Sequence, residues 1–216
     1  MNQPRITYDP HVFDAGTVDD AKWIILTPEE SATTEHRWAT ETPYLATLIS
    51  RCFSLSDKSL VLDYGCGIGR LAKELLARHR CRVMGVDISP NMRSMAVAYV
   101  GSDRFSVCSP AELDVLLERG VAFDLALAVW VLQHCASVHE DISRIARALT
   151  PHGDFFVVNG RTRCVPTVEF GWFDDGIDIY ALLKRVFSQR SRGSLPAKHT
   201  TKNLSRHASW AAFRRM

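Results

Sequence analysis

Glycines at alternate positions give one stretch of this chain an unusual backbone. A short apolar run ends at Asp63, and Gly65, Gly67 and Gly69 follow at every second position. Glycine has no Cβ atom, so the chain can turn tightly here and let a ligand touch the backbone. The Gly-x-Gly-x-Gly spacing differs from that of nicotinamide-binding loops, and Arg70 stands where a nucleoside triphosphate loop has Lys-Ser or Lys-Thr. The pattern therefore indicates a close-fitting ligand loop of another chemistry.

A second acidic residue, Asp87, ends the next apolar run and lies 20 residues after Gly67. In a strand–helix–strand unit, an acid at this place can accept hydrogen bonds from both hydroxyls of a ribose. Taken alone, Asp87 is also compatible with a turn residue before a helix. Together with the glycine loop it favours a site for a nucleoside-containing ligand.

Hydrophobic periodicity predicts the elements that must hold these residues. Strands and helices alternate from residue 60 onward, which predicts a parallel sheet with helices on both faces. In such sheets ligands bind beyond the carboxyl ends of the strands, where Asp63 and Asp87 lie. Strands are expected at residues 60–63, 81–87, 105–108, 122–131, 155–158, 186–189 and 209–213, and helices at 68–79, 90–99, 110–117, 138–149 and 179–186.

The first part of the chain differs from this alternating pattern. Up to about Trp23 the sequence is polar and mixed and predicts no element. Helix starts are expected at Thr27-Pro28 and again at Thr42-Pro43, because threonine caps a helix and proline suits its first position. We therefore expect a helical appendage and substrate cap over residues 1–54, followed by one domain over residues 55–216. The polar stretch between the two late strands is expected to be a loop.

Composition places the chain among ordinary globular proteins. Of its 216 residues, 46% are hydrophobic and 23% are charged, and the formal net charge is +2. The six cysteines have neither zinc nor redox spacing, so no metal site is expected and the thiols are expected to be reduced. No signal peptide or membrane-spanning stretch is evident, which favours a cytoplasmic protein without a membrane partner.

Residues 61–69, 85–92, 123–135 and 144–158 together resemble the class I S-adenosylmethionine-dependent methyltransferases, particularly those that act on small molecules. These segments have the family's order and spacing over roughly half of the chain, although His152 stands where the family often has glycine. The resemblance implies a single Rossmann-like, doubly wound α/β domain, with a mostly parallel seven-stranded sheet, helices on both faces and an antiparallel last strand. It also implies S-adenosyl-L-methionine as the cofactor and a small molecule as the methyl acceptor.

The resemblance assigns a cofactor role to particular residues. Asp63 would orient the methionine amino group through the loop, Asp87 would hold the ribose, and Arg37 would reach the carboxylate. Ser109 stands where the family often has an acid that contacts the adenine amine, so the backbone N–H of Ala111 is an alternative contact. The full set implied is Arg37, Asp63, Gly65, Cys66, Gly67, Gly69, Asp87, Ile88, Met92, Ser109, Ala111, Val129 and Trp130.

Four residues of this set would supply apolar surface. Ile88 and Met92 would pack beside the adenine. Val129 and Trp130, at the end of the fourth strand, would line the floor under the methionine part. Trp130 is also one of four aromatic residues that could either line an apolar acceptor pocket or belong to the core; the others are Trp38, Trp172 and Phe173.

His134 is the candidate catalytic residue. Methyl transfer from a sulfonium is a direct displacement, so the protein mainly aligns the reacting atoms. A base is needed only for an acceptor that stays protonated near neutral pH. His134 lies just past the fourth strand, and its neutral imidazole could take such a proton. The alternative is a helix-start histidine that hydrogen-bonds to the backbone.

Other activities are compatible with parts of the sequence. Methylation of RNA or protein would use the basic residues between Lys184 and Arg215 as a docking face. A cofactor-binding protein without transfer activity is a second alternative. The glycine spacing disfavours a dehydrogenase, and the lack of an Asn-Pro-Pro-Tyr or Asn-Pro-Pro-Phe motif disfavours a DNA adenine methyltransferase. Nucleic acid is therefore not the expected partner, and the protein is expected to be a monomer or a homodimer.

Overall fold

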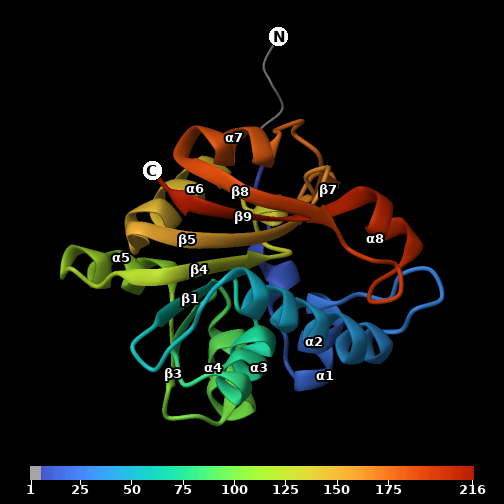
Figure 1. The fold of residues 1–216 in the computed structure, drawn as a ribbon. Coiled ribbons are helices and arrows are strands. Elements are labelled where there is room, and N and C mark those ends of the chain that lie inside the picture. The colour runs from blue at the N-terminus through green and yellow to red at the C-terminus, as the bar shows by residue number, and fades with distance from the viewer. Residues whose placement is uncertain (1–5) are drawn as a thin grey trace.

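A computed structural model describes residues 6–216 of the chain (Figure 1). A seven-stranded sheet crosses the molecule, with strand order β3-β2-β1-β4-β5-β9-β8. β1 pairs in parallel with both β2 and β4, whereas β9 runs antiparallel between β5 and β8. The strands of this sheet span Leu60–Tyr64 (β1), Arg82–Val86 (β2), Phe105–Cys108 (β3), Phe123–Val129 (β4), Leu149–Gly160 (β5), Phe187–Ser194 (β8) and Ala208–Arg215 (β9).

Helices cover both faces of the sheet (Figure 1). One face packs against α5, α6 and α7, and the other packs against α2, α3 and α4. The helices span Val18–Ile25 (α1), Thr34–Cys52 (α2), Arg70–Arg78 (α3), Pro90–Val100 (α4), Pro110–Glu118 (α5), Val138–Ala148 (α6), Ile179–Val186 (α7) and Lys202–His207 (α8), and two short 3-10 helices span Pro10–Phe13 (η1) and Leu132–His134 (η2).

The central strand β4 shows why the sequence specifies this fold. Successive side chains of a strand point to opposite faces. Leu125 and Leu127 accordingly join the core on the α2–α3 side, and Ala126 and Ala128 join the core on the α5–α6 side. Because both faces are buried, the strand is a nearly continuous apolar run in the sequence. The predicted fold class, with a mostly parallel seven-stranded sheet and an antiparallel last strand, is confirmed.

The N-terminal helices differ from the sequence prediction. Thr27 and Pro28 precede the helix, and α2 begins at Thr34, where the side chain of Thr33 accepts a hydrogen bond from the backbone N–H of His36. The second helix start was wrong, because Pro43 lies inside α2. Proline normally breaks a helix by removing one backbone hydrogen bond. Here α2 continues through it because one of its faces is buried against the domain from Arg37 to Ile49.

The periodicity did not predict the segments that lie over the carboxyl ends of the strands. A hairpin of Val165–Thr167 (β6) and Gly171–Phe173 (β7) is inserted after β5. The start of the described chain pairs with this hairpin, since Tyr8 forms a β-bridge with Thr167. The stretch between the two late strands, expected to be a loop, contains α8.

The described part of the appendage and substrate cap expected over residues 1–54 packs onto the domain. Its long helix α2 shares the core of α3, and α1 packs beside α2. Residues 1–5 of that range lie outside the described residues. From residue 6 to residue 216, none of the helices combines the length and apolar character that a bilayer crossing would need.

Candidate functional site

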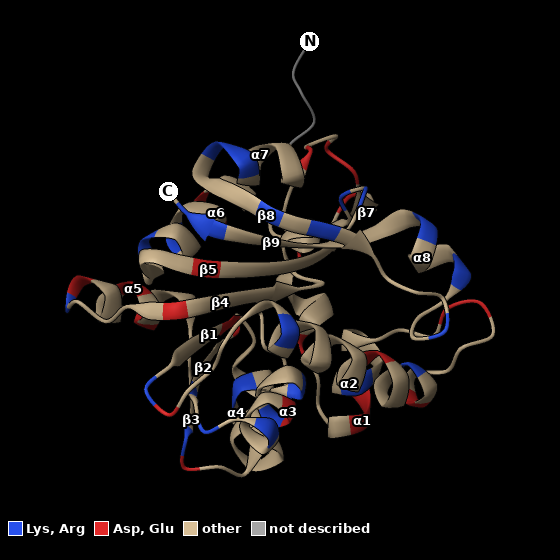
Figure 2. Ribbon diagram, in the orientation of Figure 1, with Lys and Arg blue, Asp and Glu red and all other residues tan. Residues whose placement is uncertain are grey.

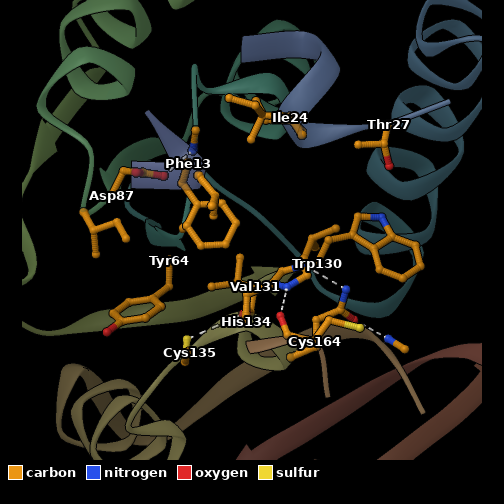
Figure 3. A pocket seen from close by; sticks show the side chains of 18 of the residues that line it. Phe13, Ile24, Thr27, Tyr64, Asp87, Trp130, Val131, His134, Cys135 and Cys164 are labelled. Atoms are coloured by element: carbon orange, nitrogen blue, oxygen red, sulfur yellow. Dashed lines mark hydrogen bonds between the residues drawn. The ribbon is translucent and has the colours of Figure 1, made fainter. Parts of the chain in front are cut away.

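A cavity of about 710 Å³ lies at the carboxyl ends of β1, β2 and β4 (Figure 3). Many of the predicted site residues line it, and their backbones come from different elements. These residues are Arg37, Gly65, Gly67, Asp87, Ile88, Met92, Val129, Trp130 and His134. The other predicted residues are not part of the lining: Asp63, Cys66, Gly69, Ser109 and Ala111.

Two positions of the glycine loop that line the cavity, Gly65 and Gly67, require glycine. Gly65 and Gly67 have φ angles of +72° and +55°, in the left-handed region that favours glycine. A Cβ atom on Gly67 would lie 2.6 Å from Cδ1 of Ile25, and one on Gly65 would lie 2.4 Å from Cγ2 of Val131. The backbone is therefore bare at both positions, and side chains from α1 and from the turn after β4 lie directly against it.

Asp87 joins the end of β2 to this loop. Its Oδ2 accepts a hydrogen bond from the backbone N–H of Gly67 at 2.8 Å, and its Oδ1 accepts one from the N–H of Ser89 at 3.0 Å. Burial raises the pKa of the Asp87 carboxyl, and these backbone hydrogen bonds act in the opposite direction. The structure thus brings together the two motifs that the sequence placed 20 residues apart.

Asp63 lies behind the loop at the end of β1 and is almost completely buried. Burial raises its pKa to about 7, against the opposing influence of Arg70 and a backbone hydrogen bond from Ala72. Its Oδ2 atom finds no hydrogen-bond partner within residues 6–216. Such atoms are rare in folded proteins, because burying a polar group without a partner is costly. The carboxyl therefore keeps one oxygen unpaired next to the glycine loop.

The predicted adenine side of the cavity is apolar. Met92 is buried, whereas Ile88 is 43% exposed, and both line the cavity. Pro110 also lines it, in the place where the sequence analysis named its neighbours Ser109 and Ala111. The Ser109 hydroxyl caps α5: it donates to Glu112 Oε2 at 2.8 Å and accepts from the Glu112 backbone N–H at 3.2 Å.

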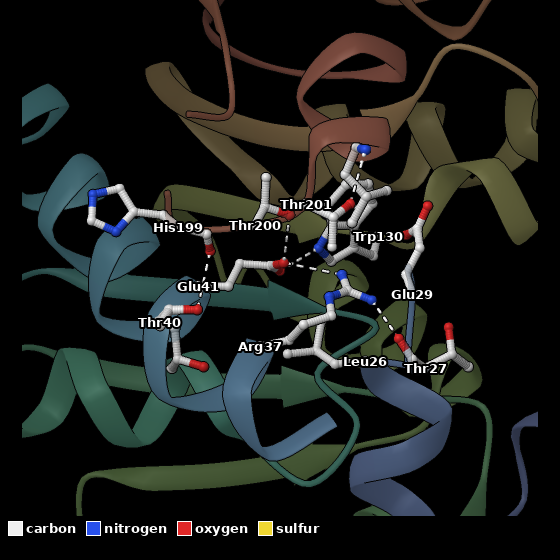
Figure 4. Close-up of polar contacts among 12 residues, drawn as sticks. Leu26, Thr27, Glu29, Arg37, Thr40, Glu41, Trp130, His199, Thr200 and Thr201 are labelled. Atoms are coloured by element: carbon white, nitrogen blue, oxygen red, sulfur yellow. Dashed lines mark hydrogen bonds and ion pairs between the residues drawn. The ribbon is translucent and has the colours of Figure 1, made fainter. Parts of the chain in front are cut away.

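Arg37, on α2, also lines the cavity (Figure 4). Its Nη1 donates to the backbone oxygen of Thr27 at 2.7 Å, and its Nη2 donates to Glu41 at 3.0 Å. The Nε atom is buried and lacks a partner in the described part of the chain. An anionic group in the cavity would satisfy this donor.

Trp130 occupies a turn directly after β4. Its φ angle is +63°, which costs a bulky residue of the order of 1–3 kcal/mol. Its backbone N–H donates to the oxygen of Val158 at 2.8 Å, and its indole Nε1 donates to Glu41 at 2.6 Å. These bonds hold the indole against the cavity, although the backbone of Trp130 has a conformation that residues other than glycine disfavour.

His134 is held in one tautomer by its neighbours (Figure 3). Its Nδ1 lies 2.7 Å from the backbone oxygen of Cys164, which can only accept, so Nδ1 carries the proton. The Gln133 side-chain oxygen accepts from the N–H of Gly160, so the Gln133 amide nitrogen donates to His134 Nε2 at 3.0 Å. Burial lowers the pKa of His134, which favours the neutral imidazole.

Aromatic rings from separate parts of the chain surround His134. The ring of Phe13 on η1 lies 5.6 Å from that of His134, and the ring of Trp172 on β7 lies 5.4 Å from it. Both rings line the cavity, together with Trp130. Trp38 instead packs against Tyr99, and Phe173 against Phe170, and neither lines the cavity.

Several residues that shape this site were not predicted from the sequence. Phe13 and Ile25 lie in a segment for which no element was predicted, and Glu41 lies on a helix predicted to be broken near it. One signal was present for Glu41: it follows Arg37 by four residues, the spacing of an ion pair on a helix.

Comparisons with known proteins agree with this geometry. Residues 62–157 match a family model described as a methyltransferase domain. The chain is 28% identical over 166 residues to a ubiquinone biosynthesis O-methyltransferase of Bartonella quintana, a match that covers 73% of this chain and 66% of that protein. Other relatives of this name are covered over as little as 41% of their length, so the chain spans roughly two fifths to two thirds of the curated relatives that it matches.

Solved structures share the fold at low sequence identity. The N-methyltransferase NodS of Bradyrhizobium japonicum, in complex with S-adenosyl-L-homocysteine, has a TM-score of 0.62 and 16% identity, covering 90% of this chain and 96% of that one. The cyclase SpnF has a TM-score of 0.61 and 16% identity, covering 80% of this chain and 81% of that one. Residues 62–157 thus match a methyltransferase domain, and the sheet shares the fold of structures described as methyltransferases.

Proposed function

We propose that this chain binds S-adenosyl-L-methionine and transfers its methyl group to a small-molecule acceptor by direct displacement. When bound, the cofactor supplies a methyl group on a positively charged sulfur. The hydrogen bond from Gly67 to Asp87 at the cavity wall carries this proposal. It brings the bare loop and the acid together at the strand ends, where this type of sheet holds a nucleoside.

Two buried polar atoms fit the amino-acid part of this cofactor. Arg37 Nε and Asp63 Oδ2 are without partners across the described residues. The Arg37 donor belongs to a side chain that lines the cavity and would complement a ligand carboxylate, whereas Asp63 lies behind the loop and would act on an amino group only through it. We assign the carboxylate to Arg37 and, through the glycine loop, the amino group to Asp63.

The remaining side chains would bind and align rather than react. Asp87 would accept hydrogen bonds from the ribose, and Ile88 and Met92 would pack beside the adenine. Holding the reactants in the correct geometry can lower a barrier by about 7–11 kcal/mol. His134, neutral and close to the aromatic rings, would accept the proton of an acceptor that needs a base. Its Nε2 must first release the Gln133 amide.

The size and lining of the cavity support a small-molecule acceptor. Its volume of about 710 Å³ lies within the range of about 300–1,000 Å³ found for small-molecule sites. Phe13, His134 and Trp172 give it an aromatic surface, as expected for an organic molecule rather than a polymer backbone. The relatives named as O-methyltransferases of ubiquinone biosynthesis support the same class of acceptor.

Methylation of RNA or protein is the alternative that one observation favours. Lys and Arg residues recur along α7, β8 and α8 (Figure 2). A docking face for phosphates would make affinity fall steeply with salt. A protein named as a cyclase shares this fold, and a cofactor-binding protein without methyl transfer is the other alternative. A cytoplasmic location and a monomeric or dimeric state stay predictions.

Two measurements test the proposal. Calorimetry should show that the protein binds S-adenosylhomocysteine, and that Arg37→Gln weakens this binding more than the binding of methylthioadenosine, which lacks the amino-acid part. Cofactor labelled in its methyl group should then pass label to the small-molecule fraction of an extract. Label in the RNA or protein fraction would support the first alternative, and binding without any transfer would support the second.

A further inference from the structure

The buried carboxylate of Glu41 connects separate parts of the chain beside the cavity (Figure 4). Its Oε1 accepts a hydrogen bond from Trp130 Nε1 at 2.6 Å and lies 3.6 Å from Nη1 of Arg70. Its Oε2 accepts from Arg37 Nη2 at 3.0 Å and from Thr200 Oγ1 at 3.3 Å. One side chain on α2 therefore holds the start of α3, the turn after β4 and the segment before α8.

Glu41 does not line the cavity, but two of its partners do. Trp130 and Arg37 both face the cavity, and Arg70 begins the helix that follows the glycine loop. Any influence of Glu41 on a ligand must therefore pass through these neighbours.

Both partners need Glu41 to keep their present geometry. Trp130 has a left-handed backbone conformation, which its indole hydrogen bond to Glu41 helps to maintain. The Arg37 guanidinium is planar, and its contacts with Glu41 and the Thr27 oxygen fix that plane. This orientation decides where the unpartnered Nε atom is presented.

Stability alone gives little reason for this arrangement. Replacing a buried ion pair by well-packed apolar residues is often neutral or stabilising, because desolvation opposes the attraction between the charges. The Glu41 carboxylate and both guanidinium groups are nevertheless buried: the Glu41 side chain is 0% exposed, and those of Arg37 and Arg70 are 5% and 4% exposed. A requirement for orientation accounts for burying these charges.

We propose that Glu41 is a positioning residue for the methionine end of the cofactor site, where it fixes Trp130 and Arg37 together. This inference rests on the proposed function. Glu41 sets the place of the Trp130 indole and of the Arg37 guanidinium, so its replacement should affect the amino-acid part of a ligand more than its nucleoside.

The test compares two ligands on matched variants. Glu41→Gln keeps an oxygen that can accept from the Trp130 indole, but it gives Arg37 no carboxylate. Trp130→Phe keeps an aromatic ring at this position, though a smaller one, and removes the indole donor. We expect each variant to bind S-adenosylhomocysteine about tenfold more weakly, the effect of one hydrogen bond to a charged group, with methylthioadenosine affinity within about threefold of the unchanged protein. Glu35 lies on α2, as Glu41 does, and forms an exposed ion pair with Lys22 of α1; Glu35→Gln loses this pair and should bind both ligands normally.

A spectroscopic measurement needs no ligand. The chain has five tryptophans, so Trp130→Phe identifies the Trp130 indole N–H resonance as the one that disappears. A short hydrogen bond to a carboxylate should place this resonance downfield, and Glu41→Gln should move it upfield. Glu35→Gln should leave it in place.

The outcomes separate this inference from the proposed function. If Glu41→Gln and Trp130→Phe lower the affinity for both ligands equally, or lower it for neither ligand, the positioning role is wrong. If Glu41→Gln does not fold, Trp130→Phe decides alone. The quantity is then the ratio of its affinities for S-adenosylhomocysteine and methylthioadenosine, and a ratio equal to that of the unchanged protein overturns the role. Failure of the unchanged protein to bind S-adenosylhomocysteine would instead contradict the proposed function, while the indole resonance would still report the Glu41 contact.

Discussion

The backbone N–H of Gly67 donates a hydrogen bond to the Asp87 carboxylate at 2.8 Å, so the glycine loop and the end of β2 form one structural unit. The same carboxylate accepts from Ser89, the N-cap of α4. A ligand that contacts Asp87 therefore meets a side chain already fixed by two backbone groups. This fixation reduces the ordering that binding requires.

Replacing Asp87 should weaken nucleoside binding. We expect Asp87→Ala to lower the affinity for S-adenosylhomocysteine by more than about tenfold, because hydrogen bonds to a charged group are lost. Asp87→Asn keeps one acceptor and should be intermediate. Calorimetry checks both, with Asp103→Asn, on an exposed loop, as the control. Normal affinity in Asp87→Ala would contradict the ribose assignment.

Gly67→Ala should destabilise the protein more than an alanine at another left-handed glycine. At Gly120, with φ of +84°, an added Cβ meets nothing within 4 Å, so Gly120→Ala pays only the backbone penalty of about 1–2 kcal/mol. At Gly67 the Cβ also overlaps Ile25. Thermal or urea unfolding should therefore show a larger loss for Gly67→Ala, and Ile25→Ala should recover part of the difference. Equal losses at the two glycines would show that Ile25 moves aside freely.

Asp63 should make stability fall as pH rises. Burial raises the pKa of its carboxyl from 3.8 to about 7, so between these values the folded protein holds a proton that the unfolded chain has released. The unfolded state then binds fewer protons, and the free energy of unfolding decreases with increasing pH up to about 7. The effect is of the order of a few kcal/mol.

Asp63→Asn measures this contribution directly. The stability difference between the unchanged protein and the variant should decline from about pH 4 to pH 7 and then level off. Urea unfolding at a series of pH values provides the data. A difference that stays constant over this range would show that Asp63 does not retain its proton.

His134→Ala should separate a base from a structural histidine. With an acceptor found by the labelling experiment, a base role predicts that turnover falls by about 100-fold or more while S-adenosylhomocysteine affinity is kept. Because burial lowers the pKa of His134, turnover should hold below pH 6.5, its ordinary pKa, before protonation removes the base. Unchanged turnover in the variant would rule out the base.

The same histidine should affect stability in acid. Its pKa in the folded protein is lowered, so below about pH 6.5 the unfolded chain binds a proton that the folded protein resists. Stability should therefore fall as pH drops below that value, and His134→Ala should remove this part of the dependence. Unfolding curves at pH 5 to 7.5 would test it, and parallel curves for the two proteins would contradict it.

The sequence by itself determined the sheet and the donor loop. Runs such as Leu125 to Ala128 can bury both faces only in a central strand, and residues such as Gly67 and Asp87 act through local backbone geometry that their own chemistry dictates. Local signals of this kind are present in the order of residues. They predicted the alternation of strands and helices and pointed to the carboxyl ends of the strands as the place of the site.

The tertiary structure alone decided what surrounds the cofactor loop. Phe13 and Trp172 meet at His134 from opposite ends of the chain, and Pro43 remains inside α2 because packing outweighs its local preference. Glu41 obtains its partners from residues as distant as Trp130 and Thr200, contacts that no local pattern encodes. Pairings over such separations depend on how the whole chain packs, so they could not be deduced from the sequence.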